Sequence, residues 1–281
     1  MKANKLKKIN VSITKIISYT ILIIGVIWVM LPFIWMILTA LKPANEVLVM
    51  PPKWIPSRFQ WSNFKEALDS VPFKTYFLNS VFVAVCVTAG ELITTILSAF
   101  AFSHINFKFK NTLFMALVAT MMVPGEILMI PNYVTLSNFG WINTYKALIF
   151  PWCASIFSIF LLRQQFLSIP KSYYKSSKMD GCSDLRYLFT ILVPMSMPTL
   201  ISIGILKFIN SWNSYMWPLI TTNSQSMRTL PVALAAFSTE AGTRYHILMA
   251  FSVVVIAPII IMYIFTQKYI IKGVSRSGLK G

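Results

Sequence analysis

The sequence contains 281 residues, of which 56% are hydrophobic and only 12% charged, whereas soluble domains average about 25% charged residues. A soluble domain of this composition would expose large apolar patches. The same figures exclude a disordered chain and a disulfide-stapled secreted domain, so we expect an integral membrane protein. The net charge of +17 fits basic loops on the cytoplasmic side of a membrane better than a nucleic-acid-binding surface.

Six segments have the roughly 20 mostly apolar residues that a membrane-spanning helix requires. We therefore expect an all-α, polytopic membrane protein with a short cytoplasmic helix between its fourth and fifth spans. The first segment is too long for a cleaved signal peptide. Pro194, Pro198 and Pro258, inside the last two spans, break backbone hydrogen bonds that must be satisfied locally, and they either serve conformational switching or are static kinks. The expected spans are residues 16–41, 77–102, 112–130, 147–166, 187–209 and 248–271, within a transmembrane domain 16–271 that is flanked by segments 1–15 and 272–281.

The loops between these spans differ in charge. Those on the side of the two termini carry about twice as many Lys and Arg residues as those on the opposite side. Because basic residues are retained on the cytoplasmic side, we expect both termini in the cytoplasm. Long polar loops leave a substantial surface on each face of the membrane.

The loop between the fourth and fifth spans contains a short helix between two stop signals. Pro170 disfavours helix at the residue before it, Ser172 is a candidate N-cap, and Gly181 can adopt the left-handed conformation that ends a helix. About two turns remain, which is marginal for an isolated helix, so the segment needs a docking surface. From the residues alone, an amphipathic turn at the membrane interface is an equally good interpretation.

The residues of this loop resemble the motif of a known family. They are similar to the E-A-A-x-x-D-G and I-x-x-P pattern of permease subunits of binding-protein-dependent ABC importers, in the form Lys175-Ser176-Ser177-Lys178-Met179-Asp180-Gly181 followed by Ile191-Leu192-Val193-Pro194. Further matches in register are Leu78-Asn79-Ser80, Ala99-Phe100-Ala101-Phe102-Ser103, Trp212-Asn213-Ser214-Tyr215 and the C-terminal stretch 273–281. Over residues 78–281 the chain resembles the maltose and multiple-sugar subfamily. It departs from the pattern at Lys175, where the family has a glutamate.

The resemblance implies one half of a transmembrane carbohydrate pathway in a bacterial cell membrane. A second homologous permease would form the other half, two ATPase subunits would bind the cytoplasmic face, and an extracellular solute-binding protein would deliver the sugar. This chain would bind no cofactor, since ATP and Mg²⁺ belong to the ATPases and the sequence has no G-x-x-x-x-G-K-[ST] phosphate loop. A carrier for glycerol phosphate or another small solute is an alternative within the same family.

The resemblance also implies that the loop helix couples the permease to its ATPase. Asp180 is expected to bond nearby backbone N–H groups, and Lys175 implies an acidic or neutral group on the matching ATPase. The expected coupling residues are Ser172, Lys175, Ser176, Ser177, Asp180 and Gly181.

Charged residues inside spans are expected to be functional. Glu91 lies in the second span, and Lys207 lies late in the fifth. Three interpretations of Lys207 are open: it pairs with a glutamate and holds the bundle together, it lines a cavity through which a sugar passes, or it snorkels to the outer interface. Asn210, Asn213 and Tyr215, near the end of the same span, are candidate sugar contacts along the pathway.

The outside segment of residues 210–247 is long and contains a polar stretch. Glu240, Gly242 and Arg244 lie in this stretch, with the glycine as a flexible point. The resemblance implies that the stretch reaches the solute-binding protein. A solvated connector is the alternative.

Two other classes of function fit the residues less well. An autonomous secondary transporter would show internal repeats, and the sequence has no convincing one. An intramembrane enzyme would need a nucleophile–base set or metal ligands within its spans, and neither H-E-x-x-H nor G-x-S-x-G occurs.

Overall fold

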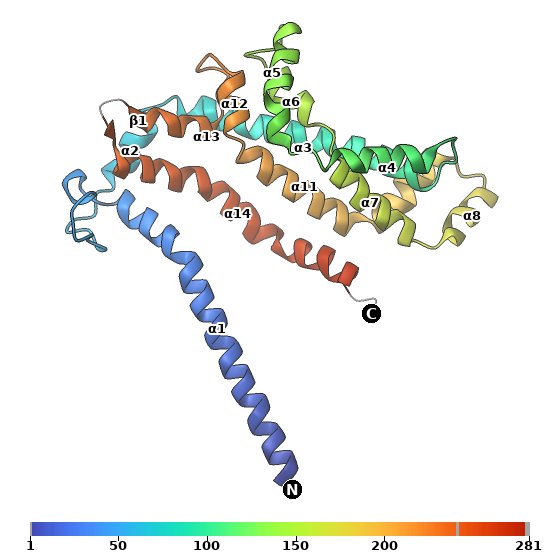
Figure 1. Cartoon of the computed structure of the whole chain (residues 1–281), viewed down its shortest axis with the longest axis horizontal. Helices are drawn as coiled ribbons and strands as arrows, with labels where there is room; N and C mark the ends of the chain where they lie inside the picture. The colour runs from blue at the N-terminus through green and yellow to red at the C-terminus, as the bar shows by residue number, and fades with distance from the viewer. Residues whose placement is uncertain (1, 240–241, 279–281) are drawn as a thin grey trace. The chain divides into compact units, whose positions relative to one another are not determined.

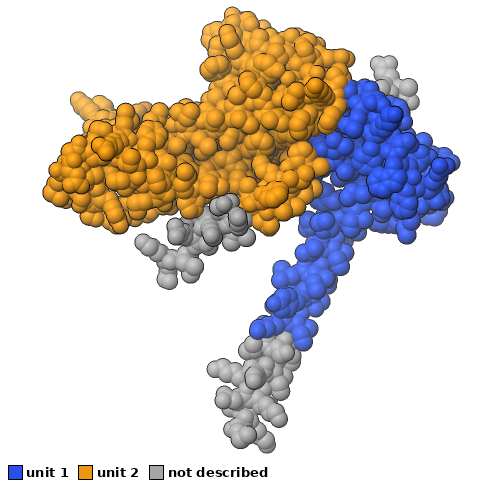
Figure 2. Space-filling view, turned by 180° about the vertical axis from the view of Figure 1, so that it is seen from behind, with its two compact units in different colours: residues 1–71, 234–256 blue, residues 72–233, 257–281 orange. Residues whose placement is uncertain are grey.

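The computed structural model describes the backbone of residues 2–239 and 242–278 and the side chains of residues 14–237 and 242–267. Most of the described chain is helical, which confirms the all-α expectation (Figure 1). The described strands form one short ladder, in which β1 (Ser238–Thr239) runs antiparallel to β2 (Gly242–Thr243). The chain forms two compact units, residues 1–71 with 234–256 and residues 72–233 with 257–281 (Figure 2).

The first unit contains the N-terminal helix and the elements that cap its end. These are α1 (Lys2–Ala40), η1 (Ala44–Glu46), α2 (Ser62–Asp69), η5 (Leu234–Phe237), the β ladder and the first part of α14 (Tyr245–Gly278). From residue 14 onward α1 is apolar on nearly all sides and its side chains are largely exposed, as expected for a helix surrounded by lipid or a partner. Asn63 on α2 donates hydrogen bonds to the carbonyls of Ala40 at 2.8 Å and Lys42 at 2.9 Å, which satisfies carbonyl groups at the end of α1.

The second unit is a helical body built around α3 (Phe73–Ser103), which packs along α7 and α11 (Figure 1). Buried apolar side chains from α3, α7, α9, η4 and α11 form its main core. The elements after α3 are α4 (Lys110–Thr120), η2 (Gly125–Leu128), α5 (Met129–Asn138), α6 (Tyr145–Ile149), η3 (Phe150–Trp152), α7 (Ile156–Ser168), α8 (Lys171–Met179), α9 (Asp184–Tyr187), the π-helix η4 (Leu188–Leu192), α10 (Val193–Met195), α11 (Met197–Trp212), α12 (Met216–Thr221) and α13 (Leu230–Ala233).

Four described segments are long and apolar enough to cross a membrane: Thr14–Ala40, Phe73–Ser103, Tyr145–Ser168 and Tyr245–Gln267. Two further segments pass this test only as bent pairs: Lys110–Thr120 with Gly125–Asn138 at 88°, and Asp184–Met195 with Met197–Trp212 at 80°. The described chain therefore has four crossings, or up to six if each bent pair is one span.

The third and fifth expected spans are thus bent rather than continuous. Pro124 stands at the start of η2, and Pro198 lies in the first turn of α11. Proline lacks a backbone N–H and clashes with the preceding turn, so a helix breaks just before it. The fifth span breaks at Ser196, between Pro194 and Pro198, whereas Pro258 lies inside the uninterrupted helix α14; a switching role for these prolines stays a prediction.

Candidate functional site

α8 lies in the loop between the fourth and fifth expected spans, at one end of the second unit (Figure 1). The helix starts directly after Pro170, whose ψ of 134° is extended, and no side chain caps its first turn. The predicted N-cap role of Ser172 is therefore wrong, because the helix has already begun at Lys171. Proline is tolerated at the N-cap because the N–H of that residue takes no part in the hydrogen bonds of the helix.

The other end of α8 forms at Gly181, as predicted, with a φ of +73°. The backbone N–H of Cys182 donates to the Ser177 carbonyl at 2.9 Å, and that of Gly181 donates to the Lys178 carbonyl at 3.1 Å. These bonds form a Schellman motif, which satisfies the last carbonyls and sets the direction of the following chain. The exposed Asp180 carboxylate has no hydrogen-bond partner among the described residues, so its predicted bond to backbone N–H groups is wrong.

One face of α8 packs against an aromatic cluster at the end of α3 and in α9. The ring centroid of Tyr174 lies 5.0 Å from that of Tyr187 and 5.4 Å from that of His104. Ser177, three residues after Tyr174, is buried and donates its hydroxyl to the Tyr174 carbonyl at 2.8 Å. Burial, reinforced by two nearby lysines, lowers the pKa of His104, so this ring is neutral at neutral pH.

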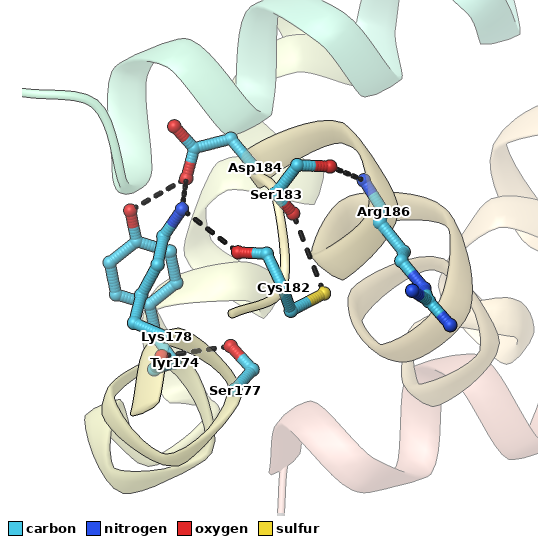
Figure 3. Close-up of polar contacts among 7 residues, drawn as sticks. All are labelled: Tyr174, Ser177, Lys178, Cys182, Ser183, Asp184 and Arg186. Carbon is cyan, nitrogen blue, oxygen red and sulfur yellow. Dashed lines mark hydrogen bonds and ion pairs between the residues drawn. The ribbon is translucent and has the colours of Figure 1, made fainter. Parts of the chain in front are cut away.

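A polar contact ties α8 to α9 (Figure 3). Asp184 Oδ1 accepts a hydrogen bond from the Tyr174 hydroxyl at 2.8 Å and lies 2.8 Å from the Lys178 ammonium. The same ammonium donates to the Cys182 carbonyl at 3.2 Å. The hydrogen bonds to Asp184 raise the pKa of both Tyr174 and Lys178 above their usual values. Together with the ring packing, this contact holds α8 in a fixed orientation.

The opposite face of α8 is exposed. Lys175 and Ser176 lie on it, and their side chains make no hydrogen bond or ion pair with the described residues. Lys171, Ser172 and Met179 extend the same face, and Met179 is 82% exposed. The outer face of α8 therefore presents two lysines and one exposed apolar side chain, whereas its inner face is packed.

A cavity of about 260 Å³ lies within the second unit. The structure brings Lys207 and Asn210 to its wall and places Glu91 against Lys207, whereas Asn213 and Tyr215 are exposed outside the lining. The lining residues are Ser80, Val83, Val87, Leu148, Trp152, Lys207, Asn210, Ser211, Ser214, Trp217, Pro218 and Thr229.

Lys207 and Glu91 form an ion pair that joins α11 to α3, with 2.6 Å between Lys207 Nζ and Glu91 Oε2. The Ser158 hydroxyl of α7 donates to the other carboxylate oxygen at 2.6 Å. The Lys207 and Glu91 side chains are only 15% and 3% exposed, so each charge needs the other. The pairing interpretation is confirmed, and the snorkelling interpretation is wrong because the ammonium faces Glu91 inside the bundle.

Asn79 and Ser80, at the start of α3, have a role that sequence reasoning missed. The Asn79 amide donates to the carbonyls of Ser226 at 2.7 Å and Arg228 at 2.9 Å. Ser80 Oγ accepts from the Leu230 backbone N–H at 2.7 Å. These bonds hold the segment that leads into α13, including part of the cavity wall, against α3. The partners are nearly 150 residues apart in the chain, so no local pattern in the sequence could disclose them.

Of the residues expected to contact a binding protein, Gly242 and Arg244 fall in the first unit. Glu240 lies outside the described residues, and Gly242 begins β2 with a φ of +117°. Arg244 forms an ion pair with Glu66 of α2, and both side chains are about half exposed. The segment of residues 210–247 is not one loop, since its described part includes α12, α13, η5 and the strand ladder.

Comparisons with known proteins place the chain among transport components. Residues 91–276 match the family described as binding-protein-dependent transport system inner membrane component. The chain is 34% identical over 253 residues to the arabinooligosaccharides transport system permease protein AraQ of Halalkalibacterium halodurans, an alignment that covers 89% of this chain and 91% of that protein. It is 28% identical over 273 residues to the sn-glycerol-3-phosphate transport system permease protein UgpE of Agrobacterium fabrum, covering 94% and 97%.

A solved structure shares the fold. It is a chain of a bacterial ABC transporter involved in the import of the acidic polysaccharide alginate, with a TM-score of 0.81 and 24% identity over 92% of this chain and 96% of that one. The family match covers more than half of the chain, and the similarity to AraQ extends over most of both proteins. The chain therefore belongs to the family of binding-protein-dependent transport system inner membrane components.

Proposed function

We propose that this chain is one permease half of an ATP-driven carbohydrate importer and that it couples to ATPase subunits through α8. Its family supports the role of membrane component, and the relative named for arabinooligosaccharides supports a carbohydrate as the cargo. A second, homologous permease completes the pathway, and an extracellular solute-binding protein delivers the sugar. ATP and Mg²⁺ are held by the two ATPase subunits.

The observation that carries this proposal is the construction of α8. Its inner face is fixed by the Tyr174 ring and the Asp184 carboxylate, while its outer face presents Lys175 and Ser176 without partners among the described residues. Movement of an ATPase bound to the outer face displaces α8. The contact with Asp184 passes that displacement to α9, and η4 and α10 continue it to α11 at the cavity.

The charge of the outer face specifies the ATPase. Lys175 stands where the related motif has a glutamate, so the ATPase cleft presents an acidic or neutral group opposite it. With α8 and both termini in the cytoplasm, the stretch around Glu240, Gly242 and Arg244 lies outside, where it contacts the binding protein. The excess of basic residues in the loops next to the termini supports this orientation.

The test uses substitutions at Gly181 in an importer assembled from this chain, its partner permease, two ATPase subunits and the binding protein. A β-branched side chain at a φ of +73° costs about 1–2 kcal/mol, whereas asparagine tolerates this conformation. We expect Gly181→Val to reduce ATPase co-purification and sugar-stimulated hydrolysis at least fivefold. Gly181→Asn should stay close to the unaltered importer, with membrane insertion intact in both.

A charge reversal tests the same surface independently. Lys175→Glu should weaken ATPase co-purification, while Lys74→Glu, at an exposed position early in α3, should not. Normal assembly and normal sugar-stimulated hydrolysis for both Gly181→Val and Lys175→Glu would show that α8 is not the coupling element.

A further inference from the structure

We propose that the cavity of the second unit is a subsite for one neutral, polyhydroxylated ring and that its wall excludes anionic solutes. This inference rests on the proposed function and names the class of sugar that the pathway accepts. The volume of about 260 Å³ lies just below the roughly 300–1,000 Å³ of pockets that hold drug-sized ligands. It therefore suits one sugar ring at a time, so that an oligosaccharide would place one of its rings here.

The charge of the wall sets the preference for a neutral ligand. Of the lining side chains, all within the described part of the chain, Lys207 alone is formally charged, and its ammonium lies 2.6 Å from Glu91. The second oxygen of Glu91 is bonded to Ser158, so the carboxylate is held on both sides. An anion that recruited Lys207 would leave a carboxylate that is 3% exposed without its cation, which is strongly unfavourable. The ion pair therefore gives the cavity wall no net charge, and an anionic ligand cannot draw Lys207 away from Glu91.

Unpaired polar groups point to a ligand rich in hydroxyls. The Thr229 hydroxyl lines the cavity, its residue is 4% exposed, and it has no hydrogen-bond partner in the described part of the chain. A buried hydroxyl without a partner is unfavourable, and a ligand hydroxyl relieves that cost. Asn210, Ser211 and Ser214 add an amide and two hydroxyls to the same wall, and these side chains make no hydrogen bond with the described residues. Sugar hydroxyls both donate and accept, so they match this mixture of groups.

Two indoles supply the apolar side of the subsite. The rings of Trp152 and Trp217 meet edge to face, with 5.7 Å between their centroids. The Trp217 indole N–H donates to the Ala147 carbonyl at 3.0 Å, which fixes its ring, while Trp152 is 40% exposed. Sugar C–H groups carry partial positive charge and pack on the negative face of an indole. A wall that combines indoles, hydroxyls and an amide selects a ring with one apolar and one polar face.

The first experiment measures binding to the purified importer in nanodiscs, without the solute-binding protein. The probe is methyl α-L-arabinofuranoside, a neutral single ring, followed by saturation-transfer NMR. We expect binding to the unaltered importer and affinities at least tenfold weaker for Thr229→Val and Trp152→Ala. The matched controls are Thr135→Val, at an exposed position of α5, and Trp61→Ala, at a site that is 68% exposed; both should bind normally.

The second experiment tests the charge with glycerol 3-phosphate as the anionic probe. The unaltered importer should not bind it measurably. Glu91→Gln removes the partner of Lys207, so binding of the anion should appear and should disappear again in the Glu91→Gln/Lys207→Met double variant. Only variants that retain the ATPase on purification are compared.

Two results would overturn the subsite. One is equal binding of glycerol 3-phosphate and the arabinoside by the unaltered importer. The other is that the unaltered importer and both the Thr229 and Trp152 variants behave alike. They would then either all bind the arabinoside normally or all fail to bind it. Failure of the proposed function would look different, because the ATPase would then not co-purify with this chain and no sugar would stimulate hydrolysis.

Discussion

Asn79, near the start of α3, and His104, just after its end, connect this helix to distant segments of the chain. Asn79 makes three hydrogen bonds, one of them accepted from the Tyr145 hydroxyl at 2.6 Å, and thereby holds the segment that carries Thr229. His104 packs against Tyr174, which holds α8 in place. The first residue therefore supports the cavity wall, and the second supports α8.

Replacing Asn79 tests the support of the cavity wall. Asn79→Ala removes three hydrogen bonds that are only partly buried, and each such bond contributes about 0.5–1.5 kcal/mol. We expect a lower thermal midpoint in detergent and weaker binding of the arabinoside. Asn132→Ala, at an exposed position of α5, serves as the control. An unchanged midpoint for Asn79→Ala would contradict the role given to these bonds.

His104 makes the packing of α8 against the end of α3 sensitive to low pH. Its pKa is lowered in the folded chain, mainly by burial, so folding disfavours its protonated form. The stability it contributes is complete above its ordinary pKa of about 6.5 and is lost as the pH falls below that value toward the folded pKa. We expect ATPase co-purification to decline as the pH is lowered from 7 to about 5. His104→Phe, which keeps a ring in the stack, should flatten this decline; an identical decline in both proteins would exclude His104 as its source.

Some of these residues could be identified from the sequence, and others could not. Gly181 and the option of a Lys207 ion pair follow from local chemistry, since a glycine ends a helix and a charge in a span needs a partner. Thr229 and Trp152 gain their roles only where distant segments meet. The predicted N-cap at Ser172 is wrong because the helix begins two residues earlier, with Pro170 as its N-cap.

Among the elements, α3 and η3 approach each other unusually closely. A Cβ atom on Gly90 would lie 2.6 Å from Cys153 Sγ and 3.1 Å from Cys153 Cβ, well inside contact distance. Glu91 follows directly on α3, and Trp152 precedes Cys153 in η3. The missing side chain of Gly90 therefore lets these two elements come together beside the cavity.

Adding a methyl group at Gly90 tests whether α3 and the Cys153 segment are as close as the structure shows. Gly90→Ala should destabilise the protein by about 1–3 kcal/mol, the usual cost of overpacking, although alanine is the better helix former. Adding Cys153→Ala removes the sulfur and should restore part of the loss. Gly25→Ala, where no atom lies within 4 Å of the new Cβ, should be neutral or slightly stabilising. Equal thermal midpoints for the two alanine variants would contradict the close approach.

The bends in the third and fifth expected spans show what hydropathy can and cannot predict. Apolar content over about 20 residues located both segments correctly, but it does not report whether one helix is continuous. Pro198 gave a local signal for its bend. The turn before Pro124 redirects the chain by 88° between α4 and the η2–α5 segment, an angle that depends on packing in three dimensions.

At the level of the whole chain, α8 and the cavity belong to the same compact unit, and both contact α3. Glu91, near the middle of α3, bonds to α7 and α11, while Phe100, near its end, belongs to the core beside α8. A rigid helix that joins the two sites allows α8 to bias the packing around the cavity. The family, the fold and the membrane helices were predictable from composition and motifs, but this connection required the contacts.

The central claim is that this chain moves a sugar only when α8 is driven by an ATPase. The most direct measurement is ATP-dependent uptake of labelled arabinooligosaccharide into liposomes, with the chain alone and in the complete importer. We expect no uptake and no ATP hydrolysis by the chain alone, coupled uptake by the complete importer, and loss of coupled uptake in the importer that carries Gly181→Val. Sustained ATP-driven uptake by the chain alone, or unimpaired coupling in the valine variant, would contradict it.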